Sequence, residues 1–268
     1  MQYREALNQR CNYNGLIIGN SKATHGIRPS KLDTTGIMFQ NLSINGSGPN
    51  FYIEWFTEIF DKKIESIEYL IVSVDYSFVS GSGQRKIEQD SEYFNKEIFW
   101  NLWNKKTISK NLLVSNMIPI TKYRSRMMSI NTWVYLVDDY DRGYISVERK
   151  NHFDFNKKRR FTEDFILSEK ERLNFISLID LISNADLKLI FVIPPEYNYD
   201  NQAYNDYLKF ITSFSKDRNI PLFDFNNNRF TISLAKVENF CDFVHLNSKG
   251  SQILSSAIKK ELYGNKTE

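Results

Sequence analysis

Short apolar runs recur along this 268-residue chain, and most are separated by segments whose apolar residues have helical spacing. A run of four to eight apolar residues bounded by turn residues is typical of a strand buried on both faces of a parallel sheet. Strands that alternate with helices predict an α/β fold with a doubly wound, three-layer parallel sheet of about five strands. The five runs are residues 15–18, 37–42, 67–74, 187–193 and 221–225.

The helical segments between these runs have signals of their own. Apolar residues recur at helical spacing over 50–62, where the aromatic side chains are expected to pack on the sheet as core and not to form a cofactor site. Ser168-Glu169-Lys170-Glu171 has the pattern of a capping box and predicts a helix from there to about residue 184. A further helix is expected over 203–216. The strand order expected for such a sheet is 2-1-3-4-5, as in flavodoxin-like domains.

The alternation is interrupted between about residues 79 and 162. Gly81-Ser82-Gly83 opens this insertion, segments 93–103 and 131–137 have helical patterns, and 138–143 has the composition of a turn. We therefore expect a single domain over 1–268 with a mostly helical insertion after the third strand. Such an insertion would overhang the carboxyl edge of the sheet, where its Trp and Tyr side chains could stack on sugar rings or cover an acyl chain.

A candidate catalytic group follows the first apolar run. Gly19-Asn20-Ser21 places a hydroxyl at a strand-to-helix turn, and open α/β sheets keep their chemistry at the carboxyl ends of the strands. A serine hydroxyl needs a base to become a nucleophile. Asp242 and His245 are three residues apart, so the carboxylate can hold the imidazole Nδ1 while Nε2 faces outward. Ser21, Asp242 and His245 are the candidate catalytic residues.

Two other histidines are weaker candidates for the base. His25 lies in the turn just after Ser21, so its ring is expected to point away from the hydroxyl. His152 lies in the insertion, where no carboxylate pattern singles it out. Cys241 is interpreted as a small buried residue and not as a nucleophile.

The two candidate stretches resemble the SGNH (GDSL-like) hydrolase and acyltransferase superfamily, in its divergent bacterial cell-envelope form. That family has Gly-Asp-Ser after its first strand, and here Asn20 replaces the aspartate. It also has Asp-x-x-His near the C-terminus, which Asp242-x-x-His245-Leu246-Asn247-x-x-Gly250 matches, including the Leu-Asn-x-x-Gly that leads into the last helix. The order Ser, Asp, His along the chain is that of the family.

The resemblance also implies an oxyanion hole made by backbone N–H groups of Ser21 and Gly46, with Asn41 at the family's asparagine position before that glycine. Considered alone, the loop that contains Asn41 and Gly46 favours a plain strand-to-helix connection.

A third oxyanion donor is missing from the expected place. The family has Gly-x-Asn after the third strand, but this chain has Asp75-Tyr76-Ser77. Either Ser77, Ser80 or Asn45 substitutes, or the hole has only the two backbone amides. The loss of one such donor costs roughly 10²–10³ in rate.

The resemblance implies acyl transfer at Ser21. Water as acceptor makes the protein an ester hydrolase, and a sugar hydroxyl makes it an O-acyltransferase; the sequence leaves both open. The envelope type and the large insertion favour acylated carbohydrate or cell-envelope esters over lipids. The departures at Asn20 and after the third strand support an alternative, a catalytically inactive binding or assembly module. An unrelated doubly wound domain with chance motif matches would keep Ser21 and His245 apart.

No cofactor or metal is implied. Asp138, Asp139 and Asp141 lack the ligand spacing of a calcium loop. The net charge of +3, from 35 basic and 32 acidic residues, is too balanced to predict a nucleic-acid partner. The basic run at 156–160 favours a solvated face, and a membrane surface stays open as a partner with no motif in its support.

The sequence restricts, but does not decide, the cellular location of the protein and the redox state of its two cysteines. No run of about 18 apolar residues exists and residues 1–14 are polar, so neither a transmembrane helix nor a signal peptide is expected. As it stands the chain is expected in the cytoplasm, or in the cell envelope if an N-terminal anchor has been removed. Cys11 and Cys241 are interpreted as free thiols in preference to one disulfide. Nothing in the sequence fixes an oligomeric state.

Overall fold

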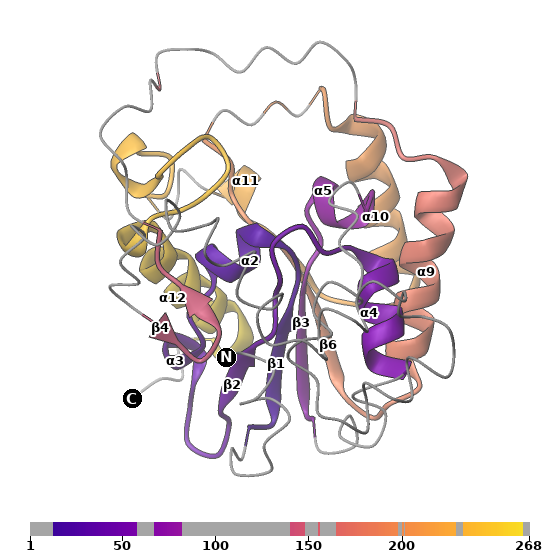
Figure 1. Ribbon diagram of the computed structural model, residues 1–268, viewed down its shortest axis with the longest axis horizontal. Coiled ribbons are helices and arrows are strands. Elements are labelled where there is room, and N and C mark those ends of the chain that lie inside the picture. The colour runs from indigo at the N-terminus through magenta and orange to yellow at the C-terminus, as the bar shows by residue number, and fades with distance from the viewer. Residues whose placement is uncertain are drawn as a thin grey trace, which may run out of the picture.

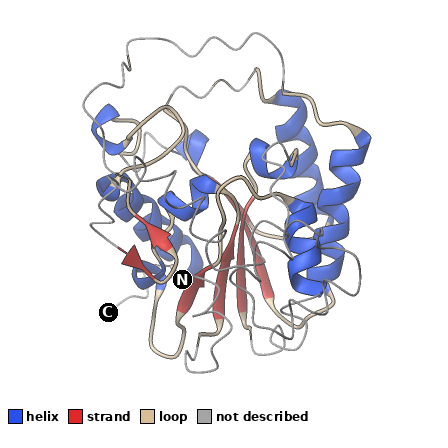
Figure 2. Ribbon diagram, viewed as in Figure 1, coloured by secondary structure: helices blue, strands red, loops and turns tan. Residues whose placement is uncertain are grey.

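The computed structural model describes residues 13–57, 67–81, 140–147, 155, 165–197, 200, 202–228 and 233–264. Its centre is a five-stranded parallel sheet between two layers of helices (Figures 1 and 2). The strands lie in the order β2-β1-β3-β6-β7, which confirms the predicted 2-1-3-4-5 order. They are β1 (Gly15–Ile18), β2 (Phe39–Asn41), β3 (Tyr69–Ser73), β6 (Lys188–Ile193) and β7 (Leu222–Asp224).

Successive side chains of a strand point to opposite faces of the sheet, so the apolar strands form one core cluster on each face. Helices cover both clusters. Leu16 and Ile18 belong to one core cluster, and Ile17 belongs to the other. The first cluster is closed by α4 (Pro49–Trp55), α5 (Tyr76–Val79), α9 (Glu169–Ser183) and α10 (Asn205–Asp217). The second is closed by α2 (Ser21–Gly26), α3 (Pro29–Leu32), α11 (Phe225–Asn228) and α12 (Ser248–Tyr263), with the short 3₁₀ helix η5 (Val237–Asn239) against α12.

The predicted helices are present with shifted ends. Helix α9 begins as expected, because the Ser168 hydroxyl accepts the N–H of Glu171 and the Glu171 carboxylate accepts the N–H of Ser168. Helix α4 has proline at its first position and ends at Trp55. The later part of the predicted segment 50–62 extends past residue 57 and lies outside the described residues. None of the helices in the described ranges is both long and apolar enough to cross a bilayer.

The described part of the insertion is a β-hairpin where a turn had been predicted. Strands β4 (Tyr140–Asp141) and β5 (Tyr144–Ile145) pair antiparallel around Arg142 and Gly143. Gly143 has a φ of +95°, and a Cβ there would lie 1.8 Å from the Asn41 carbonyl oxygen, so only glycine fits. The predicted helices at 93–103 and 131–137 and the basic run at 156–160 lie outside the described residues.

The hairpin is fixed against β2 and the helical segment between β1 and β2. The Arg142 carbonyl accepts the N–H of Asn41 at 2.8 Å, and the Arg142 guanidinium pairs with Asp33. Asp141 accepts the N–H and the hydroxyl of Ser30. A segment from the middle of the chain is thereby held beside α2 and α3.

Candidate active site

The structure brings Ser21, Asp242 and His245 together. Ser21 is the first residue of α2, directly after β1. Its Oγ lies 2.9 Å from His245 Nε2, although the two residues are 224 positions apart. His245 Nδ1 lies 2.7 Å from Asp242 Oδ2. These distances are those of a serine nucleophile, a general base and a carboxylate that orients the base.

The loop that holds the base is fixed by its own hydrogen bonds. Asp242 Oδ1 accepts the N–H groups of Val244 and His245, each at 2.8 Å. Cys241 N–H donates to the His245 carbonyl at 3.0 Å. The Asp-x-x-His spacing therefore closes a tight turn in which one carboxylate binds both the backbone and the ring of the base.

The residues after the base start the last helix. Asn247 caps α12 by accepting the N–H of Gly250 at 3.0 Å. A Cβ on Gly250 would lie 2.2 Å from the Asn239 carbonyl oxygen, so glycine lets η5 approach α12. The Leu-Asn-x-x-Gly pattern thus positions α12 against the loop that contains Asp242 and His245.

Asp242 is held in its ionised form. Partial burial acts to raise the pKa of its carboxyl, but the hydrogen bond and charge of His245 outweigh this effect. The N–H groups of Val244 and His245 act in the same direction, and the net result is a pKa below the ordinary value. At neutral pH an anion therefore faces the imidazole.

The nucleophile turn is rigid because of Gly19 and its carbonyl. A Cβ on Gly19 would lie 2.6 Å from the Ser73 Cβ, so the turn needs glycine. The Gly19 carbonyl accepts the N–H of Ile44 at 3.0 Å and the hydroxyls of Ser47 and Tyr52, each at 2.8 Å. The loop after β2 is thereby fixed to the residue two positions before Ser21.

Two backbone N–H groups are available where the oxyanion hole was expected. The Ser21 N–H donates to no acceptor among the described residues, since Asn20 accepts only from the residues that follow Ser21. Gly46, with a φ of +74°, lies in the turn between Ile44 and Ser47, both of which bind the Gly19 carbonyl. The turn is therefore adjacent to the nucleophile.

The side chains considered as further donors differ in their surroundings. Ser80, just after α5, is buried, and its hydroxyl has no hydrogen-bond partner among the described residues. Ser77 donates its hydroxyl to Asp75 and accepts the Asn20 amide at 2.8 Å. Asn45 is exposed at the turn. Asn41 is fully buried and donates to the carbonyls of Ala23 and Ile27, both at 2.9 Å, so it joins β2 to α2.

A buried ionic cluster beside Ser21 escaped the sequence reasoning. Lys22, only 7% exposed, pairs with Glu196 and lies 3.4 Å from Asp75 Oδ1; the two carboxylates are 4% and 2% exposed. The Tyr204 hydroxyl also binds Glu196. The sequence showed Lys22 directly after Ser21 and Asp75 just after the third strand. Neither residue indicated that Glu196 would pair with Lys22.

The expectation for His25 was only partly right. Its ring does not bind Ser21, but its centroid lies 5.5 Å from that of His245 in an edge-to-face arrangement. His25 Nδ1 lies 2.8 Å from the Ile145 carbonyl oxygen of the hairpin. Burial lowers the pKa of His25 to about 4, so at neutral pH the ring is uncharged and donates Nδ1–H to that carbonyl.

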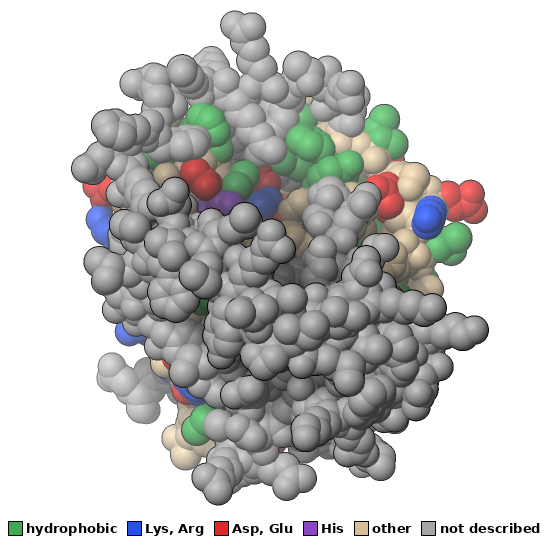
Figure 3. Space-filling view, in the orientation of Figure 1, with side chains coloured by type: hydrophobic (Ala, Val, Ile, Leu, Met, Phe, Trp, Pro, Cys, Tyr) green, Lys and Arg blue, Asp and Glu red, His purple; other side chains and the backbone are tan. Residues whose placement is uncertain are grey.

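Aromatic rings lie against the triad loop. Phe243, between Asp242 and His245, stacks with Tyr197 at 6.4 Å and meets Phe155 edge-on at 5.9 Å. Phe155, from the predicted insertion, therefore lies against the loop that contains Asp242 and His245. Figure 3 shows histidine, basic, acidic and hydrophobic side chains together in a hollow above the end of the sheet where α2 begins.

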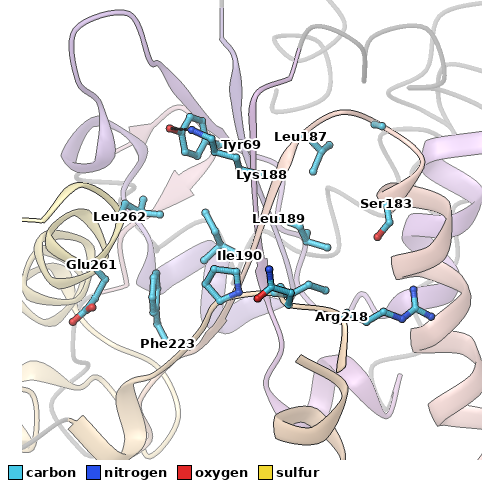
Figure 4. A pocket seen from close by; sticks show the side chains of 14 residues that line it. Tyr69, Ser183, Leu187, Lys188, Leu189, Ile190, Arg218, Phe223, Glu261 and Leu262 are labelled. Carbon is cyan, nitrogen blue, oxygen red and sulfur yellow. Dashed lines mark hydrogen bonds between the residues drawn. The ribbon is translucent and has the colours of Figure 1, made fainter. Parts of the chain in front are cut away.

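A separate cavity lies at the opposite end of the sheet. It has a volume of about 570 Å³ and is lined by the start of β6 and by residues near the ends of α9, α10 and α12 (Figure 4). None of the candidate catalytic residues lines it. Within the described ranges, no group of three or more His, Cys, Asp or Glu side chains is placed to hold a metal ion.

Two solved structures are similar to this chain over nearly its whole length. A Bacteroides fragilis protein provisionally named an acylhydrolase covers 97% of this chain and 92% of its own, with 11% identity and a TM-score of 0.46. The lipase/acylhydrolase from Enterococcus faecalis covers 94% of this chain and 96% of its own, with 10% identity and a TM-score of 0.47. No family model and no curated protein matches the chain.

Proposed function

We propose that this protein is a serine-dependent acyl-ester hydrolase or O-acyltransferase of the SGNH type. The observation that carries the proposal is the chain of contacts from Ser21 Oγ to His245 Nε2 at 2.9 Å and from His245 Nδ1 to Asp242 Oδ2 at 2.7 Å. A hydroxyl, an imidazole and an ionised carboxylate in this order form the arrangement that activates serine for attack on a carbonyl.

The reaction has two steps. Ser21 Oγ attacks the ester carbonyl while its proton passes to His245 Nε2, and Asp242 stabilises the imidazolium. The tetrahedral intermediate collapses when His245 returns the proton to the leaving alcohol, which leaves an acyl-serine. Water or a second hydroxyl then attacks the acyl group in the same manner and regenerates Ser21.

The oxyanion of the intermediate is stabilised by backbone N–H groups of Ser21 and Gly46. Ser21 N–H is the donor that α2 leaves unpaired in its first turn, and the Gly46 turn is fixed beside it through the Gly19 carbonyl. With the Ser77 hydroxyl donated to Asp75, the hole has two backbone donors. We expect a slower enzyme than one with a third side-chain donor, by roughly 10²–10³ in rate.

The substrate class we favour is acylated carbohydrate, including cell-envelope esters. The half-buried rings of Phe155, Tyr197 and Phe243 adjoin the base and offer flat apolar surfaces to a sugar ring or an acyl chain. Transfer and hydrolysis differ only in the hydroxyl that enters in the second step.

A non-catalytic binding module is the second candidate, favoured by Asn20 in place of the family's aspartate and by the absence of the family's asparagine after β3. A fluorophosphonate probe separates the two candidates, because it phosphonylates only an activated serine. We expect the full chain to be labelled at Ser21, as located by peptide mass spectrometry, and Ser21→Ala to lose the label. A folded wild-type chain that takes up no label would assign the binding module.

A further inference from the structure

Asp75 lies between the sheet and the nucleophile turn. It lies two residues after the end of β3, and its side chain is 2% exposed. Its Oδ1 accepts the Asn20 amide at 3.1 Å and lies 3.4 Å from Lys22 Nζ. Asn20 and Lys22 are the two chain neighbours of Ser21, so one carboxylate oxygen binds the residues on both sides of the nucleophile.

Asp75 is itself held firmly by its own surroundings. It caps α5 by accepting the N–H of Ser77 at 3.1 Å and that of Phe78 at 3.4 Å. Val74 N–H continues the sheet by donating to the Val192 carbonyl at 2.9 Å. Figure 1 shows α2 and α5 at the same end of the sheet. The carboxylate therefore links the nucleophile turn to a rigid part of the core.

With asparagine at position 20, the contacts require a charged acceptor at position 75. The Asn20 Oδ1 accepts the N–H of Lys22 at 3.0 Å, so its NH₂ group is the part left to face Asp75. The Lys22 ammonium is buried and needs anionic partners. One neutral amide oxygen would serve the NH₂ group but would not balance the ammonium.

The two oxygens of the carboxylate have different surroundings. Asp75 Oδ2 is buried and has no hydrogen-bond partner among the described residues. The hydrogen bonds and the ion pair of this side chain are all made by the oxygen that binds the nucleophile turn and the cap of α5.

We propose that Asp75 is a positioning residue for acyl transfer at Ser21, a role that rests on the function proposed above. By binding Asn20 and Lys22 together it fixes the rotation of the turn. It thereby keeps the Ser21 hydroxyl against His245 Nε2 and the Ser21 N–H directed at the oxyanion. A displacement of about 1 Å in a reacting group can cost about 10² in rate.

The test measures the inactivation of Asp75→Ala by a fluorophosphonate, as kinact and KI. Asp224→Ala is the matched control, because Asp224 also ends a strand and caps a four-residue helix by accepting the N–H groups of Asn226 and Asn227. We expect kinact of Asp75→Ala to fall about 100-fold with KI unchanged. For Asp224→Ala we expect kinact within about three-fold of wild type. Each variant loses one helix cap, but we expect a larger fall in Tm for Asp75→Ala, because it also removes a carboxylate from the buried Lys22 ammonium.

An exchange of side chains adds a rescue experiment. Asn20→Asp alone sets two carboxylates against each other, and we expect kinact to fall about 100-fold. In the double variant Asn20→Asp with Asp75→Asn, the carboxylate at position 20 still caps Lys22 and accepts the amide at position 75. We expect the double variant to recover to within about ten-fold of wild type.

The outcomes separate this role from the proposed function. A wild-type chain that is not labelled at Ser21 overturns both. A labelled wild type with kinact unchanged in folded Asp75→Ala overturns the positioning role alone, as does a folded exchange variant no faster than Asn20→Asp. If Asp75→Ala does not fold, as judged by circular dichroism, the exchange pair decides the question.

Discussion

Charged side chains lie at both ends of the sheet, but they are buried at one end and exposed at the other. At the carboxyl end, Lys22, Asp75 and Glu196 are all less than a tenth exposed. At the amino end, beside the cavity of Figure 4, Arg218 and Asp180 form an ion pair in which the side chains are 40% and 52% exposed. Buried charges are costly unless paired, whereas exposed pairs contribute little.

This difference, more than the size of a hollow, supports placing the proposed chemistry at the carboxyl end. The charged side chains that line the cavity at the amino end, Lys188, Arg218 and Glu261, are all exposed. At the carboxyl end, the buried ionic cluster includes Lys22, the residue after Ser21, and Ser21 Oγ lies 2.9 Å from His245 Nε2. Substitutions at the two ends should therefore have very different effects.

The largest difference expected between variants at the two ends is in the rate of labelling by a fluorophosphonate. His245→Ala removes the base, and we expect the rate of fluorophosphonate labelling to fall on the order of 10⁶-fold, as for the loss of a triad histidine. Lys188→Ala at the amino end should leave the labelling rate within about two-fold of the wild-type rate. Both rates are measured under identical conditions on folded protein. Equal rates for the two variants would remove His245 from the mechanism.

A second contrast concerns the carboxylate behind the base. Asp242→Asn leaves the shape of the loop but removes the charge that fixes the imidazole tautomer. We expect kinact to fall about 10⁴-fold with little change in Tm. Asp180→Asn, which removes an exposed carboxylate at the other end, is the control. A loss under ten-fold for Asp242→Asn would show that His245 does not depend on this carboxylate.

Stability gives a third contrast. Lys22→Met leaves Asp75 and Glu196 buried without their shared cation, and we expect the free energy of unfolding to fall by about 3–5 kcal/mol. Arg218→Met breaks an exposed pair and should cost less than about 1 kcal/mol. Urea titrations of both variants measure the difference. Similar losses would mean that burial does not distinguish the two ends.

The smallest effect expected is the response of stability to acid. The pKa of His25 is about 4 in the folded chain and about 6.5 when unfolded, so the unfolded chain binds the proton first. The contribution of His25 is therefore complete above pH 6.5 and is lost as pH falls toward 4, by about 3 kcal/mol.

The variant His25→Asn isolates this contribution. It keeps an N–H donor for the Ile145 carbonyl but does not titrate. The difference in unfolding free energy between wild type and His25→Asn, followed by urea titration from pH 7 to pH 4, should shrink by the same amount. A difference that stays constant with pH would place His25 in a solvated site.

The parts of the molecule that follow from local pattern could be predicted. The five apolar runs predicted the strands and their order, with ends that moved by at most two residues, because pairing decides where a strand stops. The Ser168 capping box and the contact between Asp242 and the His245 ring were predicted because their partners lie three residues apart. The juxtaposition of Ser21 and His245 was expected from motifs at the carboxyl edge of the sheet.

What could not be predicted depends on contacts between distant segments. Lys22 and Glu196 are 174 positions apart, and nothing in either local sequence selects the other. The orientation of His25 is set by the carbonyl of Ile145, which the hairpin brings from 120 positions away. Strands β4 and β5 have two residues each, too few to produce an alternating pattern.

The separation of the nucleophile from its base also has a consequence for biosynthesis. Ser21 lies 224 positions before His245, so a ribosome makes the proposed nucleophile well before the loop that would activate it. Until that loop has been translated and has folded onto α2, the hydroxyl has no imidazole to accept its proton and remains an ordinary alcohol. Under the proposed function, reactivity toward esters therefore begins only when translation has passed His245.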